Sequence, residues 1–174
     1  MRNLREEIIA ASEHAFDRHG FTATGMDALT QAAEVSTRTL YKYVGNKNAL
    51  IAAVLESRSE KFFNSISATT VDGLFEDLDR WIQLEGARGC LFFRAQGEGA
   101  ATVPEVADVI SSYRRKLREL IDRLVRAEIS RQDPTLVGQV LVLFEGAVTA
   151  ASYLGEEAVS AGRAAAKTLM ERAR

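Results

Sequence analysis

Apolar residues recur at helical spacing along almost the whole chain. In the first segment the apolar stripe runs through Leu4, Ile8 and Ala15, which predicts an amphipathic helix that ends near Gly20. No segment alternates apolar and polar residues convincingly with the period of two that a half-buried strand requires. The pattern therefore predicts an all-α protein.

Eight more helices follow from the same spacing. They are expected at about residues 26–33, 37–44, 47–64, 74–85, 91–99, 106–124, 135–154 and 158–172. Ser36 and Asn46 stand where they can cap the third and fourth helices. The two prolines of the chain, Pro104 and Pro134, both lie where a helix can begin.

Residues 135–154 form the most apolar segment, and its apolar side chains point around the whole circumference of the predicted helix. Such a helix needs cover on every side, which is more than one small domain supplies. Small residues in this helix and the next would let another helix approach closely, so we expect a homodimer interface at about residues 135–172. A place at the centre of a monomeric bundle is the alternative. Glu145, the one charge in the segment, is expected to pair with a cation on a neighbouring helix or to face water.

The segment VSTRTLYKYVGNKNAL, residues 35–50, contains three basic residues and no acidic one. The whole chain is slightly acidic, with 24 aspartates and glutamates against 22 lysines and arginines. This balance argues against a diffuse polycation, so any anionic partner has to bind a local patch. No acid occurs between Glu34 and Glu56, which identifies this stretch as the candidate patch.

A helical wheel of residues 36–45 separates two faces. Leu40 and Val44 fall together and are expected to be buried, whereas Arg38 and Lys42 lie nearly opposite them. A three-residue turn joins this helix to the one before it, as in a helix-turn-helix motif, whose second helix enters the DNA major groove. The cations and hydroxyls on the projecting face can donate hydrogen bonds to phosphates and base edges.

Residues 19–50, HGFTATGMDALTQAAEVSTRTLYKYVGNKNAL, resemble the TetR family of transcriptional regulators. The match combines the glycine after the first helix, the threonine before the second, Val35-Ser36, Leu40-Tyr41, and Lys47 followed by Leu50. Two nearby positions depart from the family pattern, because a glutamate stands where the turn usually has glycine and a threonine replaces a customary alanine. These are Glu34 and Thr30. A left-handed conformation at the glutamate would add strain of about 1 kcal/mol.

The resemblance implies an N-terminal three-helix helix-turn-helix domain, residues 1–46, and a C-terminal helical ligand-binding and dimerisation domain, residues 47–174. It implies a homodimeric, ligand-responsive repressor that binds a pseudo-palindromic operator in double-stranded DNA. The family pattern places four side chains at base edges and three at phosphates. These are Thr37, Arg38, Thr39 and Lys42 for the bases, and Tyr41, Tyr43 and Lys47 for the phosphates. We expect Arg38 to read a guanine.

In this family the second domain encloses a pocket for a small apolar or amphipathic effector. Most aromatic residues of the region are expected to form the core, and Trp81, Phe92 and Tyr113 are the expected pocket residues. Two alternatives stay open, a DNA-binding regulator without an effector and a helical protein-interaction module without DNA affinity. The acid-free segment argues against the second.

Other features bear on compartment and chemistry. The single cysteine, Cys90, cannot form an intramolecular disulfide, and the N-terminus lacks the apolar core of a signal peptide, so a cytoplasmic location is expected. Residues 135–154 are long enough to span a bilayer, but their polar residues and glycines favour a buried helix, and no membrane partner is expected. The sequence shows no catalytic constellation, dinucleotide fingerprint or metal-ligand spacing, so neither an enzyme nor a cofactor or metal site is expected.

Overall fold

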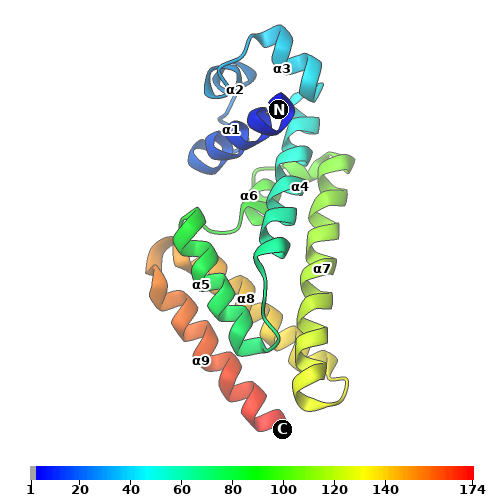
Figure 1. Cartoon of the computed structure of the whole chain (residues 1–174), viewed down its shortest axis with the longest axis vertical. Helices are drawn as coiled ribbons and strands as arrows, with labels where there is room; N and C mark the ends of the chain where they lie inside the picture. Colours follow the sequence, from blue (N-terminus) through cyan, green and yellow to red (C-terminus); the bar gives the residue numbers. More distant parts are fainter. Residues whose placement is uncertain (1–2) are drawn as a thin grey trace. The chain divides into compact units, whose positions relative to one another are not determined.

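The computed structural model describes residues 3–174, which form nine α-helices and one short 3-10 helix, η1 (Figure 1). The helices are α1 Leu4–His19, α2 Met26–Ala32, α3 Thr37–Val44, α4 Lys47–Ser65, α5 Val71–Glu85, α6 Leu91–Gly97, η1 Ala100–Thr102, α7 Pro104–Ile129, α8 Pro134–Leu154 and α9 Glu156–Ala173. No strand occurs in this part of the chain. The all-α prediction is confirmed.

Helix ends follow local capping chemistry. Both prolines begin a helix, since Pro104 is the first residue of α7 and Pro134 the first of α8, where a missing backbone N–H costs nothing. Helix α5 starts three residues before the predicted position. The reason is Thr70, whose hydroxyl accepts the backbone N–H of Gly73 at 3.0 Å and so caps the helix early.

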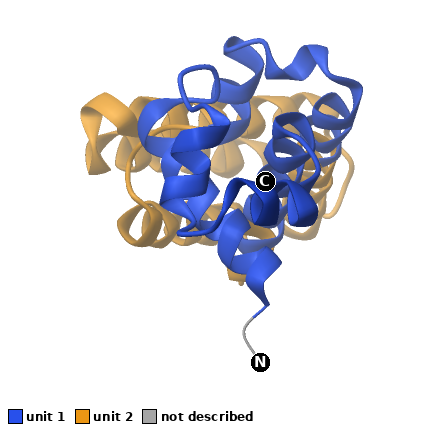
Figure 2. Cartoon of the chain, turned by 90° about the horizontal axis from the view of Figure 1, so that it is seen from above, with its two compact units in different colours: residues 1–61, 91–112 blue, residues 62–90, 113–174 orange. Residues whose placement is uncertain are grey.

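The chain divides into two compact units, coloured separately in Figure 2. Unit 1 comprises residues 1–61 and 91–112, and unit 2 comprises residues 62–90 and 113–174. Helices α4 and α7 contribute residues to both units. The predicted helix-turn-helix domain, residues 1–46, lies inside unit 1, and its boundary with the rest of the chain stays a prediction.

The core of unit 1 joins α1 to α2 and α3. Phe16 at the end of α1 stacks on Phe21 in the following turn, with ring centroids 4.8 Å apart. Both rings are buried, as are Leu29 of α2 and Leu40 of α3. Full burial of side chains of this size is worth about 1.5–3 kcal/mol each. The three short helices therefore form one apolar cluster that holds α3 against α1.

A buried ion pair connects α1 to α4 within unit 1. The Glu13 carboxylate is almost inaccessible to solvent and accepts hydrogen bonds from Arg58 at 2.9 Å and from Lys61 at 2.6 Å. Both cations lie on α4. Because removing one partner of a buried pair leaves an uncompensated charge, this contact fixes the relative register of the two helices.

In unit 2, α8 packs along α9, and α5 packs against both. Gly162 of α9 permits the close approach, since a Cβ there would lie 3.1 Å from Ala147 and from the Phe75 ring. Arg163 then ties α9 to α5 through bonds of 2.6–2.7 Å to Asp72 and Glu76. The hydrogen bond from Arg163 lowers the pKa of the Asp72 carboxyl.

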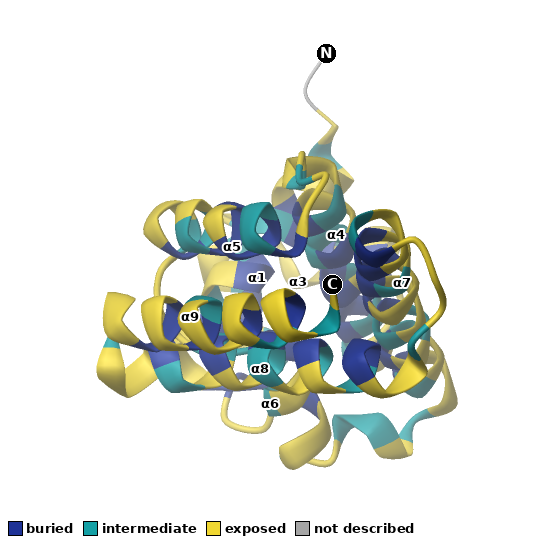
Figure 3. Ribbon diagram, turned by 90° about the horizontal axis from the view of Figure 1, so that it is seen from below, coloured by how far each residue is buried: buried dark blue, intermediate teal, exposed yellow. Residues whose placement is uncertain are grey.

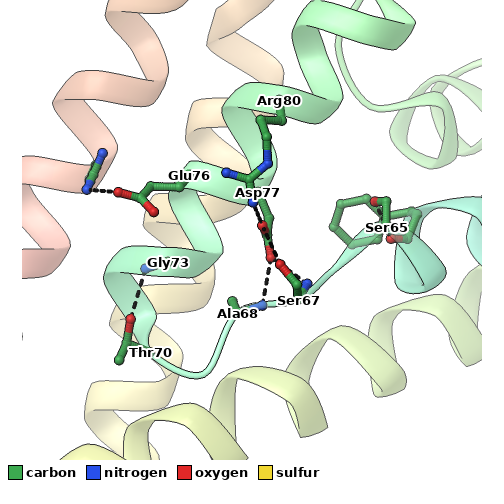
Figure 4. Close-up of polar contacts among 10 residues, drawn as sticks. Ser65, Ser67, Ala68, Thr70, Gly73, Glu76, Asp77 and Arg80 are labelled. Carbon is green, nitrogen blue, oxygen red and sulfur yellow. Dashed lines mark hydrogen bonds and ion pairs between the residues drawn. The ribbon is translucent and has the colours of Figure 1, made fainter.

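Figure 4 shows the connection between α4 and α5. The buried Asp77 carboxylate accepts the backbone N–H groups of Ser67 at 2.7 Å and Ala68 at 2.8 Å, and it also pairs with Arg80. Two backbone donors of an irregular segment are thus satisfied by one carboxylate. The connection is held as a fixed wall beside α5.

The outer surfaces of α8 and α9 carry many exposed positions in Figure 3. Val142 of α8 is 69% exposed although α8 is the most apolar helix of the chain. By length and composition alone, α8 could cross a membrane, and a third of its most apolar stretch of residues is buried inside the structure. The core helix of a soluble protein has the same length and composition. The exposure of Val142 agrees with the prediction that one subunit leaves an outer apolar face of this helix uncovered.

Candidate nucleic-acid interface

Helix α3 has the orientation that the helical wheel predicted. Leu40 is fully buried and Val44 is 7% exposed, whereas Arg38 and Lys42 lie exposed on the opposite face. The buried pair anchors the helix in the apolar core of unit 1. The two cations consequently project from a fixed element, with their charges in solvent.

Both ends of α3 are capped, which fixes its length at two turns. At the start, the Ser36 hydroxyl accepts the backbone N–H of Thr39 at 3.1 Å and lies 2.8 Å from the Thr39 hydroxyl. At the end, Gly45 has φ +74° and donates its N–H to the Tyr41 carbonyl at 2.9 Å. Thr39 is therefore partly engaged within the cap, whereas Thr37 is exposed in the first turn.

The turn between α2 and α3 is a Schellman motif built around a glutamate. The N–H of Val35 bonds to the Thr30 carbonyl and the N–H of Glu34 bonds to the Gln31 carbonyl, both at 3.2 Å. Glu34 has φ +52°, the left-handed conformation in which the family pattern has glycine. The expected strain is present, and the hydrogen bonds of the turn are formed in spite of it.

The remaining predicted contact residues surround the two cations. Tyr41 is 46% exposed and Tyr43 is 37% exposed, and the Lys42 ammonium lies 5.6 Å from the centroid of the Tyr43 ring. Lys47 is half-buried in the first turn of α4, directly after Asn46, whose side chain caps that helix through Ala49 N–H at 2.9 Å. The structure thus brings the seven predicted residues together on α3 and the start of α4.

Two contacts that could not be expected from the sequence hold α6 and the residue after it to the helix-turn-helix segment inside unit 1. Arg94 of α6 donates to the backbone carbonyl of Asp17 in α1 at 2.6 Å. Glu98 accepts the backbone N–H of Thr22 at 2.7 Å. These partners lie more than 70 residues apart in the chain, so no local pattern could have paired them.

Residues 8–54 match the model of a family described as bacterial regulatory proteins, tetR family. This region contains α2, α3 and most of α1, together with all seven predicted contact residues. The chain therefore carries the N-terminal region of the TetR family at residues 8–54. It is a DNA-binding transcriptional regulator, as the family model and the relatives below support.

Known proteins are similar to the chain in sequence and in fold. The HTH-type transcriptional repressor SCO4008 of Streptomyces coelicolor is 27% identical over 134 residues, which are 75% of this chain and 69% of that protein. The crystal structure of SCO4454, a TetR-family transcriptional regulator from the same organism, has a TM-score of 0.83 at 19% identity and covers 98% of this chain and 95% of its own. Reduced Escherichia coli NemR has a TM-score of 0.78 at 19% identity over 96% of both chains.

The predicted effector residues are distributed over both units of the chain. Trp81 and Tyr113 lie in unit 2, and both contact Phe62, with ring centroids 5.4 and 6.2 Å away. Phe92 is buried on α6 in unit 1. The aromatic rings of unit 2 pack against one another, so their place in an effector pocket stays a prediction.

The surroundings of Glu145, the acidic residue of α8, determine how its carboxyl group titrates. Glu145 is half-buried on α8, and burial raises the pKa of its carboxyl while the positive charge of Arg114 on α7 opposes the rise. A neighbouring cation was expected at this position, and Arg114 provides it. Within residues 3–174, no three His, Cys, Asp or Glu side chains group closely enough to hold a metal ion.

Proposed function

We propose that this protein is a homodimeric, ligand-responsive repressor that binds a pseudo-palindromic DNA operator. One observation carries the proposal: α3 buries one edge in its own domain and exposes two cations in a segment free of acids. A two-fold axis between two copies would present two such helices to half-sites about one helical turn apart, roughly 34–36 Å. A cytoplasmic location, where chromosomal DNA is accessible, belongs to the same proposal.

The side chains divide into base readers and phosphate contacts. Arg38 reads a guanine through two hydrogen bonds, since its guanidinium fits the acceptors of that base in the major groove. Thr37, Thr39 and Lys42 lie beside it on the same surface and contact neighbouring base edges. Phosphates are held by Tyr41, Tyr43 and Lys47.

The proposed dimer forms through α8 and α9. Their exposed side has an apolar groove of about 740 Å³, which runs along both helices. The lining residues are Thr135, Gly138, Gln139, Val142, Leu143, Ala165, Thr168 and Leu169. A second copy related by a two-fold axis would place the same apolar surface opposite itself and remove both from water. All lining residues fall within the predicted interface at 135–172.

The proposed response to a ligand uses the attachment of α6 to the reading domain. Arg94 holds the end of α1 and Glu98 holds the turn before α2, so a displacement of α6 changes the position of the helix-turn-helix segment. A small apolar or amphipathic effector acts by favouring the conformation of the dimer in which the two copies of α3 no longer fit successive grooves. No enzymatic activity belongs to the proposal.

DNA binding is tested by selecting bound fragments from random DNA with the purified protein and then measuring affinity for the selected operator. Arg38→Ala should lose the preference for one base pair and weaken binding by about 1–3 kcal/mol. Arg118→Ala, which removes an exposed arginine from α7, is the matched control and should leave base preference unchanged. Unchanged affinity and base preference in Arg38→Ala would refute the assignment.

Salt dependence separates phosphate contacts from base reading. Lys47→Ala should weaken binding to all sequences alike and reduce the slope of log affinity against log salt by about 0.9 for each site lost. A loss of base preference without a change in this slope would contradict a phosphate role.

The oligomer is tested by sedimentation of Val142→Arg, which should be monomeric. The control is Leu84→Arg, at an exposed position of α5, which should stay dimeric.

A further inference from the structure

Unit 2 has a surface cleft of about 380 Å³ between α7 and the connection that leads from α4 to α5. Its apolar part is formed by Phe63, Ile66 and Leu120, and its charged part by Lys116, Glu119 and Arg123, while Ser67 and Ala68 complete the wall. This volume lies in the range of small-molecule sites. None of the seven DNA-contact residues lies in it.

The three charged side chains share one face of α7 because they are spaced by three and four residues. Within residues 3–174, the structure gives none of the three a hydrogen bond or an ion pair. Charges further along the same helix are paired, as Arg126 is with Asp122 at 2.7 Å. The cleft therefore has two cations and one carboxylate whose hydrogen-bonding capacity is free.

The opposite wall is rigid and offers few donors. The N–H groups of Ser67 and Ala68 both bond to the buried Asp77 carboxylate, as Figure 4 shows. These two backbone donors are already satisfied and cannot bind a ligand. Lys116 and Arg123 are consequently the strong donors that remain in the cleft, and they stand two helical turns apart, about 10 Å along α7.

The apolar part of the cleft continues into the interior of unit 2. The half-buried Phe63 ring lies 5.7 Å from the Tyr113 ring and 5.3 Å from the Phe62 ring, measured between centroids. An apolar group seated against Phe63 would therefore touch a side chain that belongs to the aromatic core. This places apolar surface and free positive charge within one cleft.

We propose that this cleft binds an amphipathic anion, a small molecule with one anionic head group and an apolar body. The head group bonds to Lys116 or Arg123 at the rim, and the apolar body covers Phe63, Ile66 and Leu120. The net charge of the three rim residues, two cations against one carboxylate, selects against a cationic head group. The inference deepens the proposed ligand response, on which its regulatory meaning rests, by giving that response a site and a ligand class.

Decanoate is the probe, titrated into the full-length protein without DNA and followed by calorimetry below its micelle concentration. The wild type should bind decanoate, and acetate and decyltrimethylammonium should bind at least about tenfold more weakly, because each lacks one of the two required parts. The double variant Lys116→Met and Arg123→Met should lose about tenfold or more in affinity. Arg118→Met, on the same helix outside the cleft, should bind like the wild type.

Three results would each overturn the site: no binding of decanoate to the wild type, equal binding of decanoate by the double variant, or equal binding of decyltrimethylammonium by the wild type. Circular dichroism spectra of each variant show whether the fold is kept, so a loss of binding is assigned to the charges. Operator affinity with and without decanoate is measured separately. Binding of decanoate with unchanged operator affinity would support the site and contradict the ligand response. Release of the operator by decanoate in the double variant as well as in the wild type would support the ligand response and contradict the site.

Discussion

Gly20 and Glu98 approach each other so closely that only glycine fits at position 20. A Cβ at Gly20 would lie 2.7 Å from Oε1 of Glu98 and 3.0 Å from Oε2. The same carboxylate accepts the N–H of Thr22, so it cannot move away without losing a hydrogen bond. This contact joins the residue after α6 to the turn that leads into α2 and α3.

Gly20→Ala should destabilise the protein by about 1–3 kcal/mol or more. The backbone at Gly20 has φ +84°, which strains any side chain, and the added Cβ would also clash with the Glu98 carboxylate. Thermal unfolding measures the change. Gly25→Ala is the matched control in the same turn, since φ is −79° and no atom lies within 4 Å of its would-be Cβ. Equal stability of the two variants would contradict the contact.

The fold could be predicted from the sequence because helical periodicity and capping residues act locally. Leu40 and Val44 are four residues apart, so their common burial follows from the geometry of one helix. The start of α5 was predicted too late because Thr70, a short polar residue in a polar stretch, gave no apolar signal although it caps the helix.

The candidate site was predicted in part for the same reason. All seven predicted contact residues fall within residues 37–47, so bringing them together needed only local structure. The attachment through Glu98 could not be predicted, since Thr22 is 76 residues away and the intervening pattern does not encode which helix packs on which turn. The cleft at Lys116 could not be predicted either, because its opposite wall is formed by residues 63–68, which are distant in the chain.

Glu34→Gly should stabilise the protein by about 0.5–1 kcal/mol. Relief of left-handed strain, about 1–2 kcal/mol, exceeds the extra conformational entropy that glycine gives the unfolded chain, about 0.4–1 kcal/mol. Glu34→Ala is the control, because it removes the carboxylate but keeps the Cβ that causes the strain. Denaturant unfolding at neutral pH should therefore separate the two variants. A gain in the alanine variant as large as in the glycine variant would assign the effect to charge.

Glu145→Gln should stabilise the protein relative to the wild type, and this gain should be larger at pH 7 than at pH 4. The pKa of Glu145 is raised in the folded protein from its ordinary value of 4.5, chiefly by burial, so the unfolded chain loses its proton first as pH rises. Stability then falls with rising pH until the folded pKa is passed, and the penalty is complete above it. Because the group is only half-buried and Arg114 opposes the shift, the gain should stay below about 1 kcal/mol.

The pH dependence of Glu145→Gln is measured by denaturant unfolding at several pH values. Glu56→Gln, at an exposed glutamate on α4, is the control for the loss of one carboxylate from the surface. A variant at Glu145 that is less stable than the wild type at pH 7 would show that attraction to Arg114 outweighs the cost of burial.

Asp77→Asn should destabilise the protein by about 1–3 kcal/mol. Both N–H groups of the α4–α5 connection bond to one carboxylate oxygen, Oδ2, whereas Oδ1 accepts from the Ser67 hydroxyl and from Arg80. An amide oxygen that stays at the Oδ2 position puts an N–H₂ group against the two donors at the Oδ1 position. Asparagine also loses the charge that pairs with Arg80, so rotation of the amide cannot restore all contacts. Asp79→Asn on the same helix, where the side chain accepts one exposed bond from Gln83 at 3.1 Å, should change stability by less than about 0.5 kcal/mol. Hydrogen exchange of the Ser67 and Ala68 amides gives the direct measurement, because only loss of their acceptor exposes them. Unchanged protection of both amides together with lost stability would assign the loss to the Oδ1 contacts with Ser67 and Arg80, and unchanged stability would contradict the role of the carboxylate.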